Sequence, residues 1–378
     1  MKYYLIAGEA SGDLHGANLV RALKSLDSDA SFRGVGGQAM QSAGVALNVH
    51  YRELSFMGFI EVLQNLSTVS RIMKSCKADI KSYVPTALIL IDFSGFNLRI
   101  AKWARQNGII VHYYIAPQVW ASRASRVEKI RTYVDHLYVT LPFEPEFYAK
   151  HNYEVTFVGH PLIDAIAQTS PEEIQQFKND YNLNEKPLLA ILPGSRKQEV
   201  SRVLPTLLKA IANQDEFKVV IAGAPSLPLS FYEEYLEGTQ IIFGHTQKLL
   251  QAASLAVVTS GTATLEAALM GTPQIVVYRT SSISYAIARK IITLKYISLV
   301  NLILNREAVK ELIQNELTPE NVTREIERLK SSQQRLKLTA DYQELRTLLG
   351  SAGASSRAAK AIYENTCTHI GQAASLLD

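Results

Sequence analysis

Short apolar runs alternate with amphipathic helical stretches along most of this 378-residue chain. Such alternation predicts βαβ units, in which a parallel sheet carries helices on both of its faces. The runs that we interpret as strands lie at residues 3–8, 87–92, 109–115, 136–140, 155–159, 188–194, 217–223, 240–244, 255–259 and 273–278. The last 60 or so residues have only helical periodicity, and Thr318-Pro319 is typical of a helix start there.

A polar stretch after Pro161 separates two series of these runs. It contains Ser170-Pro171, which predicts a helix with proline at its first position. We therefore expect an α/β protein of two facing, doubly wound Rossmann-like domains with a cleft between them and a helical C-terminus. The expected domains are residues 1–168, residues 169–345, and residues 346–378, whose helices we expect to pack back on the first domain.

Composition narrows the possible partners. The formal net charge is +4 and the pI is about 8.8, a bias too weak to indicate nucleic acid but compatible with an anionic ligand or membrane surface. Cys76 and Cys367 lie far apart, so we expect neither a disulfide framework nor a zinc site. No signal peptide is visible, and the apolar stretch 283–304 contains three basic residues. We expect a cytoplasmic protein, peripheral to a membrane.

The segment LAVVTSGTATLEAALMGTP carries the most informative pattern, in which a strand is followed by Ser260, Gly261 and Thr262 and then by a helix. Small side chains let a ligand approach the backbone, and a helix N-terminus favours an anion such as a diphosphate. Glu266 could accept hydrogen bonds from a ribose diol. The alternative is an ordinary turn with a helix-capping threonine.

The segment LLAILPGSRKQEV repeats this arrangement at Gly194 and Ser195, with Arg196 and Lys197 beside the turn. A guanidinium at a helix N-terminus is well suited to hold a phosphate. The alternative is a solvated basic turn. Both turns should lie at the same edge of one sheet, facing the cleft.

The first half of the chain offers polar residues after its own strands. Asp92 ends a buried strand and could be a general base or cap the next helix, in which Asn97 lies. Gln118 and Trp120 follow another strand and would form a sugar surface, although tryptophan is more often a core residue. These residues are our candidates for the acceptor side.

The opening strand runs into an acidic glycine turn, GEASGD, at residues 8–13. Because Glu9 and Asp13 would repel a phosphate, we expect them and Ser11 to face sugar hydroxyls instead. The alternative is a tight turn in which Asp13 is a capping residue. The pattern FRGVGGQA fits a dinucleotide-binding motif, but the helix after it is too short. We expect no NAD and, since the histidines are scattered, no metal.

The stretch from Ser55 to Tyr83 begins with an apolar surface and continues with basic residues. It could be a core helix with a basic solvent face, or an interfacial segment that enters lipid while its basic residues meet anionic headgroups. The residues that would face a membrane are Phe56, Met57, Phe59 and Ile60.

Taken together, the motifs resemble the lipid-A-disaccharide synthase family, inverting glycosyltransferases of the GT-B fold. The resemblance runs in order over nearly the whole chain. It rests on GEASGD, GGQAM, SFMGFIEVL, PQVWA, VGHPL, LPGSRKQEV, SGTATLEAA and the region from Tyr296 to Asn301.

The resemblance implies that UDP-2,3-diacylglucosamine donates its sugar to 2,3-diacylglucosamine 1-phosphate, giving the β-1,6-linked disaccharide 1-phosphate and UDP. It implies no cofactor, no nucleic acid, and action on the cytosolic face of the inner membrane of Gram-negative bacteria. The oligomeric state stays open, with a homodimer as one alternative. UDP-sugar binding would fall to Gly194, Ser195, Arg196, Ser260, Gly261, Thr262, Glu266 and Asn301, where Val300 replaces the family's usual proline.

The family often reads D-x-P-D-F-N where this chain reads D-F-S-G-F-N, so Gly95 occupies the place of a second aspartate. We therefore assign the catalytic role to Asp92 or Glu9, or to positioning and leaving-group stabilisation. Two other functions remain open: an enzyme like UDP-N-acetylglucosamine 2-epimerase, and a non-enzymatic nucleotide-sugar sensor.

Overall fold

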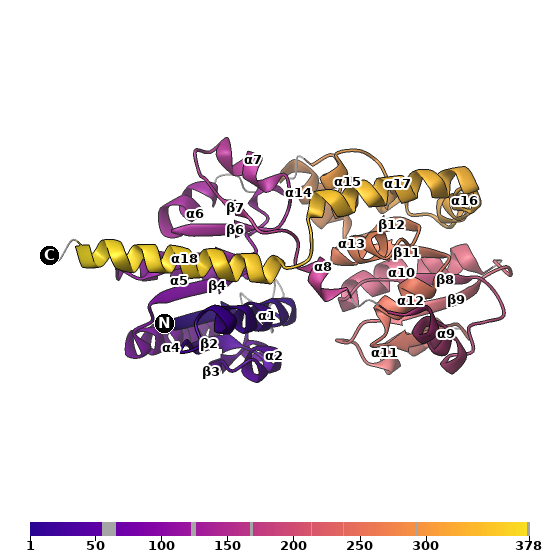
Figure 1. Cartoon of the computed structure of the whole chain (residues 1–378). Coiled ribbons are helices and arrows are strands. Elements are labelled where there is room, and N and C mark those ends of the chain that lie inside the picture. The colour runs from indigo at the N-terminus through magenta and orange to yellow at the C-terminus, as the bar shows by residue number, and fades with distance from the viewer. Residues whose placement is uncertain are drawn as a thin grey trace. The chain divides into compact units, whose positions relative to one another are not determined.

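The computed structural model describes residues 1–54, 66–121, 126–166, 169–212, 214–236, 238–291 and 294–375. The chain divides into two compact units. Unit 1 comprises Met1–Asp164 and Ser351–Asp378, and unit 2 comprises Ala165–Gly350. Each unit has its own parallel sheet between helices, so the expected α/β class with two Rossmann-like domains is confirmed (Figure 1).

In its described part, unit 1 has a seven-stranded parallel sheet in the order β3-β2-β1-β4-β5-β6-β7. The strands are β1 (Lys2–Ala7), β2 (Ser31–Gly36), β3 (Ala46–His50), β4 (Ala87–Ile91), β5 (Ile110–Tyr114), β6 (His136–Val139) and β7 (Thr156–Phe157). The helices are α1 (Ala10–Leu26), α2 (Gln38–Ser42), α4 (Leu66–Tyr83), α5 (Ser94–Gln106), α6 (Val127–Tyr133), α7 (Glu144–Ala149), α8 (Leu162–Ala165) and α18 (Ala354–Ser375).

Alternate residues of the unit 1 strands enter two different cores. Tyr4 and Ile6 of β1 pack with α4, α5 and α6, whereas Tyr3 and Leu5 pack on the opposite face with α1 and α18. This is the period of two expected for a strand that is buried on both faces. Helix α18, from the C-terminal end of the chain, lies along α1 (Figure 1).

Unit 2 has a six-stranded parallel sheet in the order β10-β9-β8-β11-β12-β13, counted over its described residues. The strands are β8 (Leu188–Leu192), β9 (Lys218–Gly223), β10 (Gln240–Phe243), β11 (Leu255–Thr259), β12 (Gln274–Tyr278) and β13 (Lys310–Ile313). The helices are α9 (Pro171–Asp180), α10 (Lys197–Ile211), α11 (Leu229–Leu236), α12 (Thr246–Ala252), α13 (Thr262–Leu269), α14 (Ser282–Ile291), α15 (Leu299–Leu304), α16 (Pro319–Lys330) and α17 (Ser332–Leu349).

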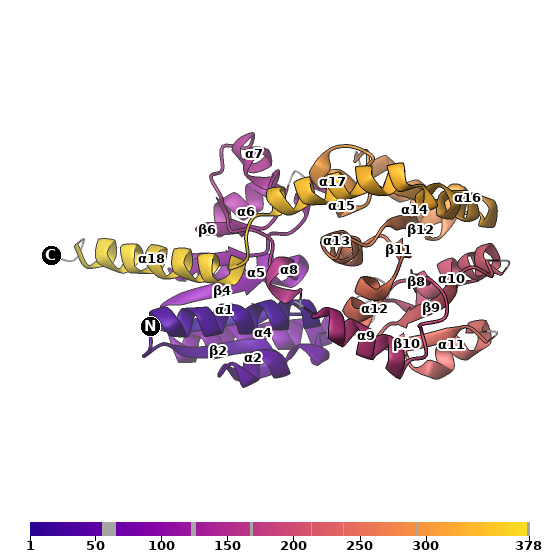
Figure 2. The same ribbon diagram turned by 45° about the vertical axis from the view of Figure 1, so that its right-hand side comes forward.

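The sheet of unit 2 is covered on both faces (Figure 2). Helices α9, α12 and α13 share one apolar core with β8, β9 and β11. Helices α10 and α16 pack against each other and against β12. The expected helix starts are confirmed, because Ser170 caps α9 in a capping box and Thr318 caps α16.

Every strand expected from the apolar runs is present, but three observed strands were missed. These are β2, β3 and β13, whose sequences SFRGVG, ALNVH and KELI mix polar with apolar residues. Strands β3 and β13 are edge strands, where one side of the ladder is unpaired and fewer apolar residues are needed. Among the helices that the structure describes, none is long and apolar enough to cross a membrane.

Candidate functional site

Two acidic residues lie side by side at the carboxyl edge of the unit 1 sheet. Strands β1 and β4 are neighbours, with Ala7 opposite Ile91, so Glu9 lies two residues and Asp92 one residue after a paired position. Gly8 has no room for a side chain, because an added Cβ would lie 2.3 Å from the ring of Phe93. The two turns are therefore packed against each other.

The backbone at Asp92 is held in an uncommon conformation. Its φ is +45°, in the left-handed region that non-glycine residues rarely adopt. The carbonyl of Asp92 accepts hydrogen bonds from the Tyr113 hydroxyl at 2.6 Å and from the Asn97 Nδ2 at 2.7 Å. Backbone strain that is fixed by surrounding groups is common at functional sites.

The pKa of Asp92 is raised, mainly by burial and further by the negative charge of Glu9. A backbone hydrogen bond from Phe93 opposes this rise. A carboxylate whose pKa is raised accepts a proton more readily near neutral pH, which suits a general base. Glu9 and Ser11 are exposed at the start of α1, and the charge of Glu9 acts on the Asp92 carboxylate.

Two residues expected on the acceptor side have their side chains engaged within unit 1. Asp13 is buried, and its carboxylate accepts the backbone N–H groups of Gly37, Ala39 and Met40 at 2.7–3.0 Å, so it caps α2. Asn97 is fully buried, and its amide donates to carbonyls at the ends of β1 and β4.

The loop after β5 supplies the other expected acceptor residues. Gln118 is exposed, whereas Trp120 is half-buried and meets the ring of Phe143 edge-on at 4.9 Å. The carboxylate of Glu144 accepts hydrogen bonds from the backbone of Thr140 and Leu141 at 3.1 and 2.8 Å. Burial raises its pKa to about 7, against the lowering effect of these N–H groups and of the Trp120 indole.

The two small-residue turns of unit 2 lie at one edge of its sheet, as expected from their strands. Strands β8 and β11 are neighbours, and Leu192 pairs with Val258. The turn before α10 and the turn before α13 therefore start from adjacent positions. Ser195 and Arg196 of the first turn are exposed, as are Gly261 and Thr262 of the second.

The turn before α10 differs from a free anion site, because a carboxylate of the chain already occupies it. Glu199 accepts the backbone N–H groups of Ser195 at 3.1 Å and Arg196 at 3.3 Å. Gly194 has a φ of +116°, and an added Cβ would lie 2.8 Å from Glu199. These N–H groups are therefore taken up by the chain's own carboxylate. The positive charge of the turn comes from the exposed side chains of Arg196 and Lys197, and the Arg196 guanidinium lies 3.7 Å from the Glu199 carboxylate.

The turn before α13 is open. An added Cβ at Gly261 would meet nothing within 4 Å. The hydroxyl of Ser260 donates to the carbonyl of Ile297 at 2.9 Å, so it holds the neighbouring segment rather than pointing freely outward. Burial raises the pKa of Glu266, and among the described residues its carboxylate has no recorded hydrogen-bond partner. This carboxylate is available to a ligand.

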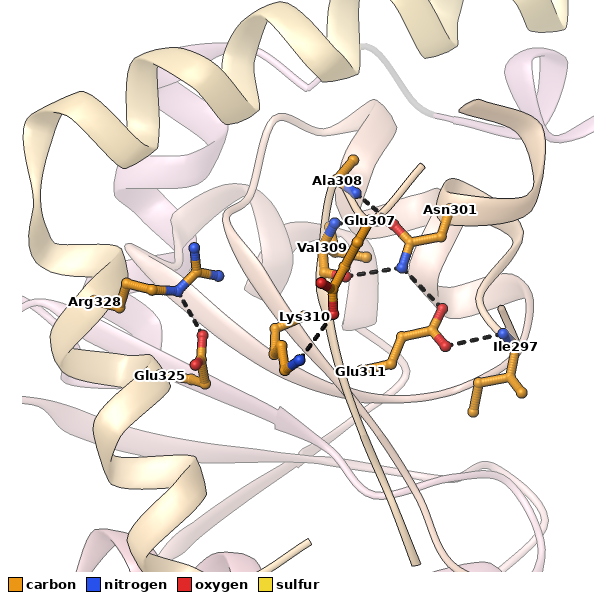
Figure 3. Close-up of polar contacts among 9 residues, drawn as sticks. All are labelled: Ile297, Asn301, Glu307, Ala308, Val309, Lys310, Glu311, Glu325 and Arg328. Atoms are coloured by element: carbon orange, nitrogen blue, oxygen red, sulfur yellow. Dashed lines mark hydrogen bonds and ion pairs between the residues drawn. The ribbon is translucent and has the colours of Figure 1, made fainter. Parts of the chain in front are cut away.

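Asn301, expected to contact UDP, is fully buried, and its side-chain amide is fully used inside unit 2 (Figure 3). Its Oδ1 accepts the N–H groups of Ala308 and Val309, and its Nδ2 donates to the Val309 carbonyl and to Glu311. These four bonds, all 2.8–2.9 Å long, leave it as a brace for the segment around it.

The expected membrane-facing residues Phe56, Met57, Phe59 and Ile60 lie outside the described residues. Farther along the same stretch, α4 packs an apolar face into the unit 1 core, and its Lys77 and Lys81 lie over the ring of Trp103. In the part of the chain that the structure describes, no three His, Cys, Asp or Glu side chains gather as a metal site.

Three buried or half-buried carboxylates were missed in the sequence analysis. Glu199 could have been found, since it lies three residues after the helix N-cap, the glutamate position of a capping box. Glu144 and Glu311 gave no such signal, because a glutamate at a helix start or in an edge strand is usually solvated.

Comparison with known proteins decides the family. A family model described as lipid-A-disaccharide synthetase matches residues 3–364. This chain belongs to that family. The lipid-A-disaccharide synthase of Syntrophus aciditrophicus is 39% identical over 366 residues, covering 94% of this chain and 95% of that protein. The synthase of Myxococcus xanthus is 37% identical over 370 residues, with 95% and 96% covered.

Solved structures share the fold of this family member. UDP-GlcNAc 2-epimerase from Neisseria meningitidis, bound to UDP-GlcNAc, has a TM-score of 0.65 at 13% identity, with 97% of this chain and 100% of that chain covered. A calicheamicin glycosyltransferase has a TM-score of 0.59 at 13% identity, with 96% and 97% covered. At such identities the likeness shows the fold alone, so the epimerase alternative gains no support from it.

Proposed function

We propose that this chain is a hexosyltransferase that joins UDP-2,3-diacylglucosamine to 2,3-diacylglucosamine 1-phosphate. The products would be the β-1,6-linked lipid A disaccharide 1-phosphate and UDP. The observation that carries the proposal is the family match over residues 3–364, which includes both turns of unit 2 and both acidic turns of unit 1.

Unit 2 is proposed to bind the nucleotide at the carboxyl edge of β8 and β11. The open backbone at Gly261 and the N-terminus of α13 suit a diphosphate, and the guanidinium of Arg196 adds a positive charge nearby. Glu266 suits the ribose diol, because its carboxylate is desolvated and has no recorded partner among the described residues. The same groups would stabilise the charge that grows on the leaving UDP.

Unit 1 is proposed to bind the acceptor and to supply the base. The carboxylate of Asp92 removes the proton from the 6-hydroxyl of the acceptor while that oxygen forms a bond to the anomeric carbon of the donor. The bond from the anomeric carbon to the diphosphate oxygen breaks, and its electron pair leaves with UDP. Of the two candidates Asp92 is better supported, since it is desolvated and its backbone is fixed, whereas Glu9 is exposed.

We also propose that the protein acts on the cytosolic face of the inner membrane without spanning it. Diacylated substrates reside in a bilayer, and the apolar residues from Phe56 to Ile60 would contact it. Co-sedimentation with vesicles that contain anionic phospholipid tests this point. Replacing Phe56 and Phe59 by serine should reduce binding, and unchanged binding would contradict it.

Mass spectrometry of a reaction with both acylated substrates tests the function. We expect a tetraacylated disaccharide monophosphate to appear together with UDP, and neither product to form when the acceptor is omitted. Conversion of UDP-GlcNAc into its 2-epimer without an acceptor would overturn the proposal. Tight UDP binding with no transfer under any condition would favour a nucleotide-sugar sensor instead.

A further inference from the structure

We propose that Glu311 is a positioning residue for the nucleotide site, acting through the segment from Ile297 to Asn301. This inference rests on the proposed function, because it takes the turn at Ser260 as part of the UDP site. Nothing in the sequence marked Glu311, which lies in the edge strand β13. The hydrogen bonds around it connect that strand to the turn before α13.

The carboxylate of Glu311 is the centre of this connection (Figure 3). It is 6% exposed and accepts three hydrogen bonds, each 2.9 Å long. One oxygen accepts the N–H of Ile297, and the other accepts the N–H of Ser298 and the Nδ2 of Asn301. Since all three partners are donors, the site matches a carboxylate and does not match an amide.

Asn301 fixes the other end of the segment. Its amide bonds to the backbone of Ala308 and Val309, while its own backbone N–H donates to the Ser298 hydroxyl at 3.2 Å. Asn301 is fully buried, so these bonds are protected from water. Hydrogen bonds from both the backbone and the side chains of the segment from Ile297 to Asn301 therefore hold it in place.

Ile297 connects this segment to the turn before α13. The hydroxyl of Ser260 donates to the carbonyl of Ile297 at 2.9 Å, and the N–H of Ile297 donates to Glu311. One peptide segment is therefore held between the carboxylate and the turn. Loss of the carboxylate frees the segment, and Ser260 loses the acceptor that orients its turn.

The Glu311→Gln variant tests the inference, because either orientation of the new amide places an NH₂ group against at least one N–H donor. We expect its dissociation constant for UDP to rise about tenfold, within the range reported for residues that act through a packed network. Glu307→Gln is the matched control. It removes a carboxylate from the same stretch whose recorded partner is the Lys310 ammonium, and it should leave UDP affinity unchanged.

A double-mutant cycle with Ser260→Ala separates positioning from a general loss of stability. Calorimetry would measure UDP affinity for wild type, Glu311→Gln, Ser260→Ala and the double variant, at a temperature where each is folded. We expect each single variant to bind more weakly and the double variant to bind no worse than the weaker single variant, because both act through Ile297. Additive effects, or UDP affinity equal to wild type in Glu311→Gln, would overturn the inference.

A second variant and the kinetics of transfer distinguish a positioning role of Glu311 from a purely structural one. If Glu311→Gln does not fold, Glu311→Asp retains the charge but shortens its reach, and the same comparison applies. In the transfer assay, the donor KM should rise while kcat stays near wild type, whereas a purely structural role would lower the melting temperature and leave the donor KM unchanged. Wild type that binds UDP but makes no disaccharide would contradict the proposed function and leave the calorimetric test of Glu311 intact.

Discussion

At the scale of single residues, two glycines in equivalent turns have opposite reasons to be glycine. Gly194 is required by the chain itself, because its φ is +116° and Glu199 fills the space beside it. Gly261 has an extended backbone and open space in front of it. The fold explains the first glycine, whereas the open space at the second is what the proposed UDP site would use.

This contrast predicts a clean separation of stability from binding. Gly194→Ala should lower the free energy of unfolding by about 1–3 kcal/mol, as strain at a positive φ does. Gly261→Ala should change it by less than about 1 kcal/mol and should weaken UDP binding, since the new methyl group occupies the ligand's space. Urea unfolding and UDP calorimetry measure the two effects. Gly371→Ala, in α18 and also without a neighbour within 4 Å, is the control for UDP binding and should leave the affinity unchanged.

The pair of carboxylates in unit 1 predicts a shift in pH dependence. A base must be ionised to work, so activity should rise with pH through the pKa of Asp92. The charge of Glu9 contributes to raising that pKa, so Glu9→Gln should move the acidic limb of the kcat profile to lower pH.

Asp92→Asn should lower kcat by about 10²–10⁴-fold, the usual contribution of a general base. An acidic limb that stays in place in Glu9→Gln would argue that the two carboxylates do not interact in the working enzyme. Full activity of Asp92→Asn would transfer the role of base to another group.

At the scale of elements, the sequence predicted at which sheet edges polar residues lie, but not which of their side chains are free of hydrogen bonds within the chain. Apolar runs place strand ends, and parallel strands bring those ends to one edge, which is why Asp92, Arg196 and Ser260 lie where expected. Asp13 and Asn97 also follow strand ends, yet both are buried, with their side chains hydrogen-bonded to the backbone of unit 1. The pattern of residue types is the same whether a polar side chain faces a ligand or the backbone of a neighbouring turn, and only the three-dimensional contacts separate the two.

The turn between β6 and α7 predicts a pH-dependent stability. Burial raises the pKa of Glu144 to about 7 in the folded state, whereas a solvated glutamate titrates near 4.3. Between these values the folded chain binds more protons than the unfolded chain, so this group makes stability fall as pH rises, by up to about 4 kcal/mol in total.

Glu144→Gln removes this dependence, because glutamine stays neutral. We expect the free energy of unfolding of wild type, minus that of the variant, to fall between pH 5 and pH 8 in urea titrations. Glu146→Gln, an exposed neighbour on α7 paired with Lys150, is the control and should lack this trend. A difference that is flat over this range would show that Glu144 is ionised in the fold throughout.

At the scale of the whole molecule, the chain returns to its first unit after completing the second. Helix α18 buries Ala358 and Ile362 against the unit 1 sheet. Its Thr366 lies 3.1 Å from the Nε2 of the buried His112, and Asn365 donates to the Tyr138 hydroxyl. Unit 1 is therefore incomplete without residues that come last in the sequence, whereas unit 2 is a continuous segment with its own core.

Removal of residues 351–378 should therefore affect the two units differently. Without α18 one face of the unit 1 sheet is exposed, so hydrogen exchange should accelerate in β1, β5 and α1 while the strands of unit 2 keep their protection. UDP should bind the truncated chain with nearly unchanged affinity, because every group proposed to hold it belongs to unit 2, and transfer activity should be lost with the acceptor side. Ala358→Glu, which places a charge in the same interface, should give a weaker form of the same result. Equal loss of protection in both units, or loss of UDP binding, would show that the nucleotide site depends on unit 1 and that the assignment of donor and acceptor to separate units is wrong.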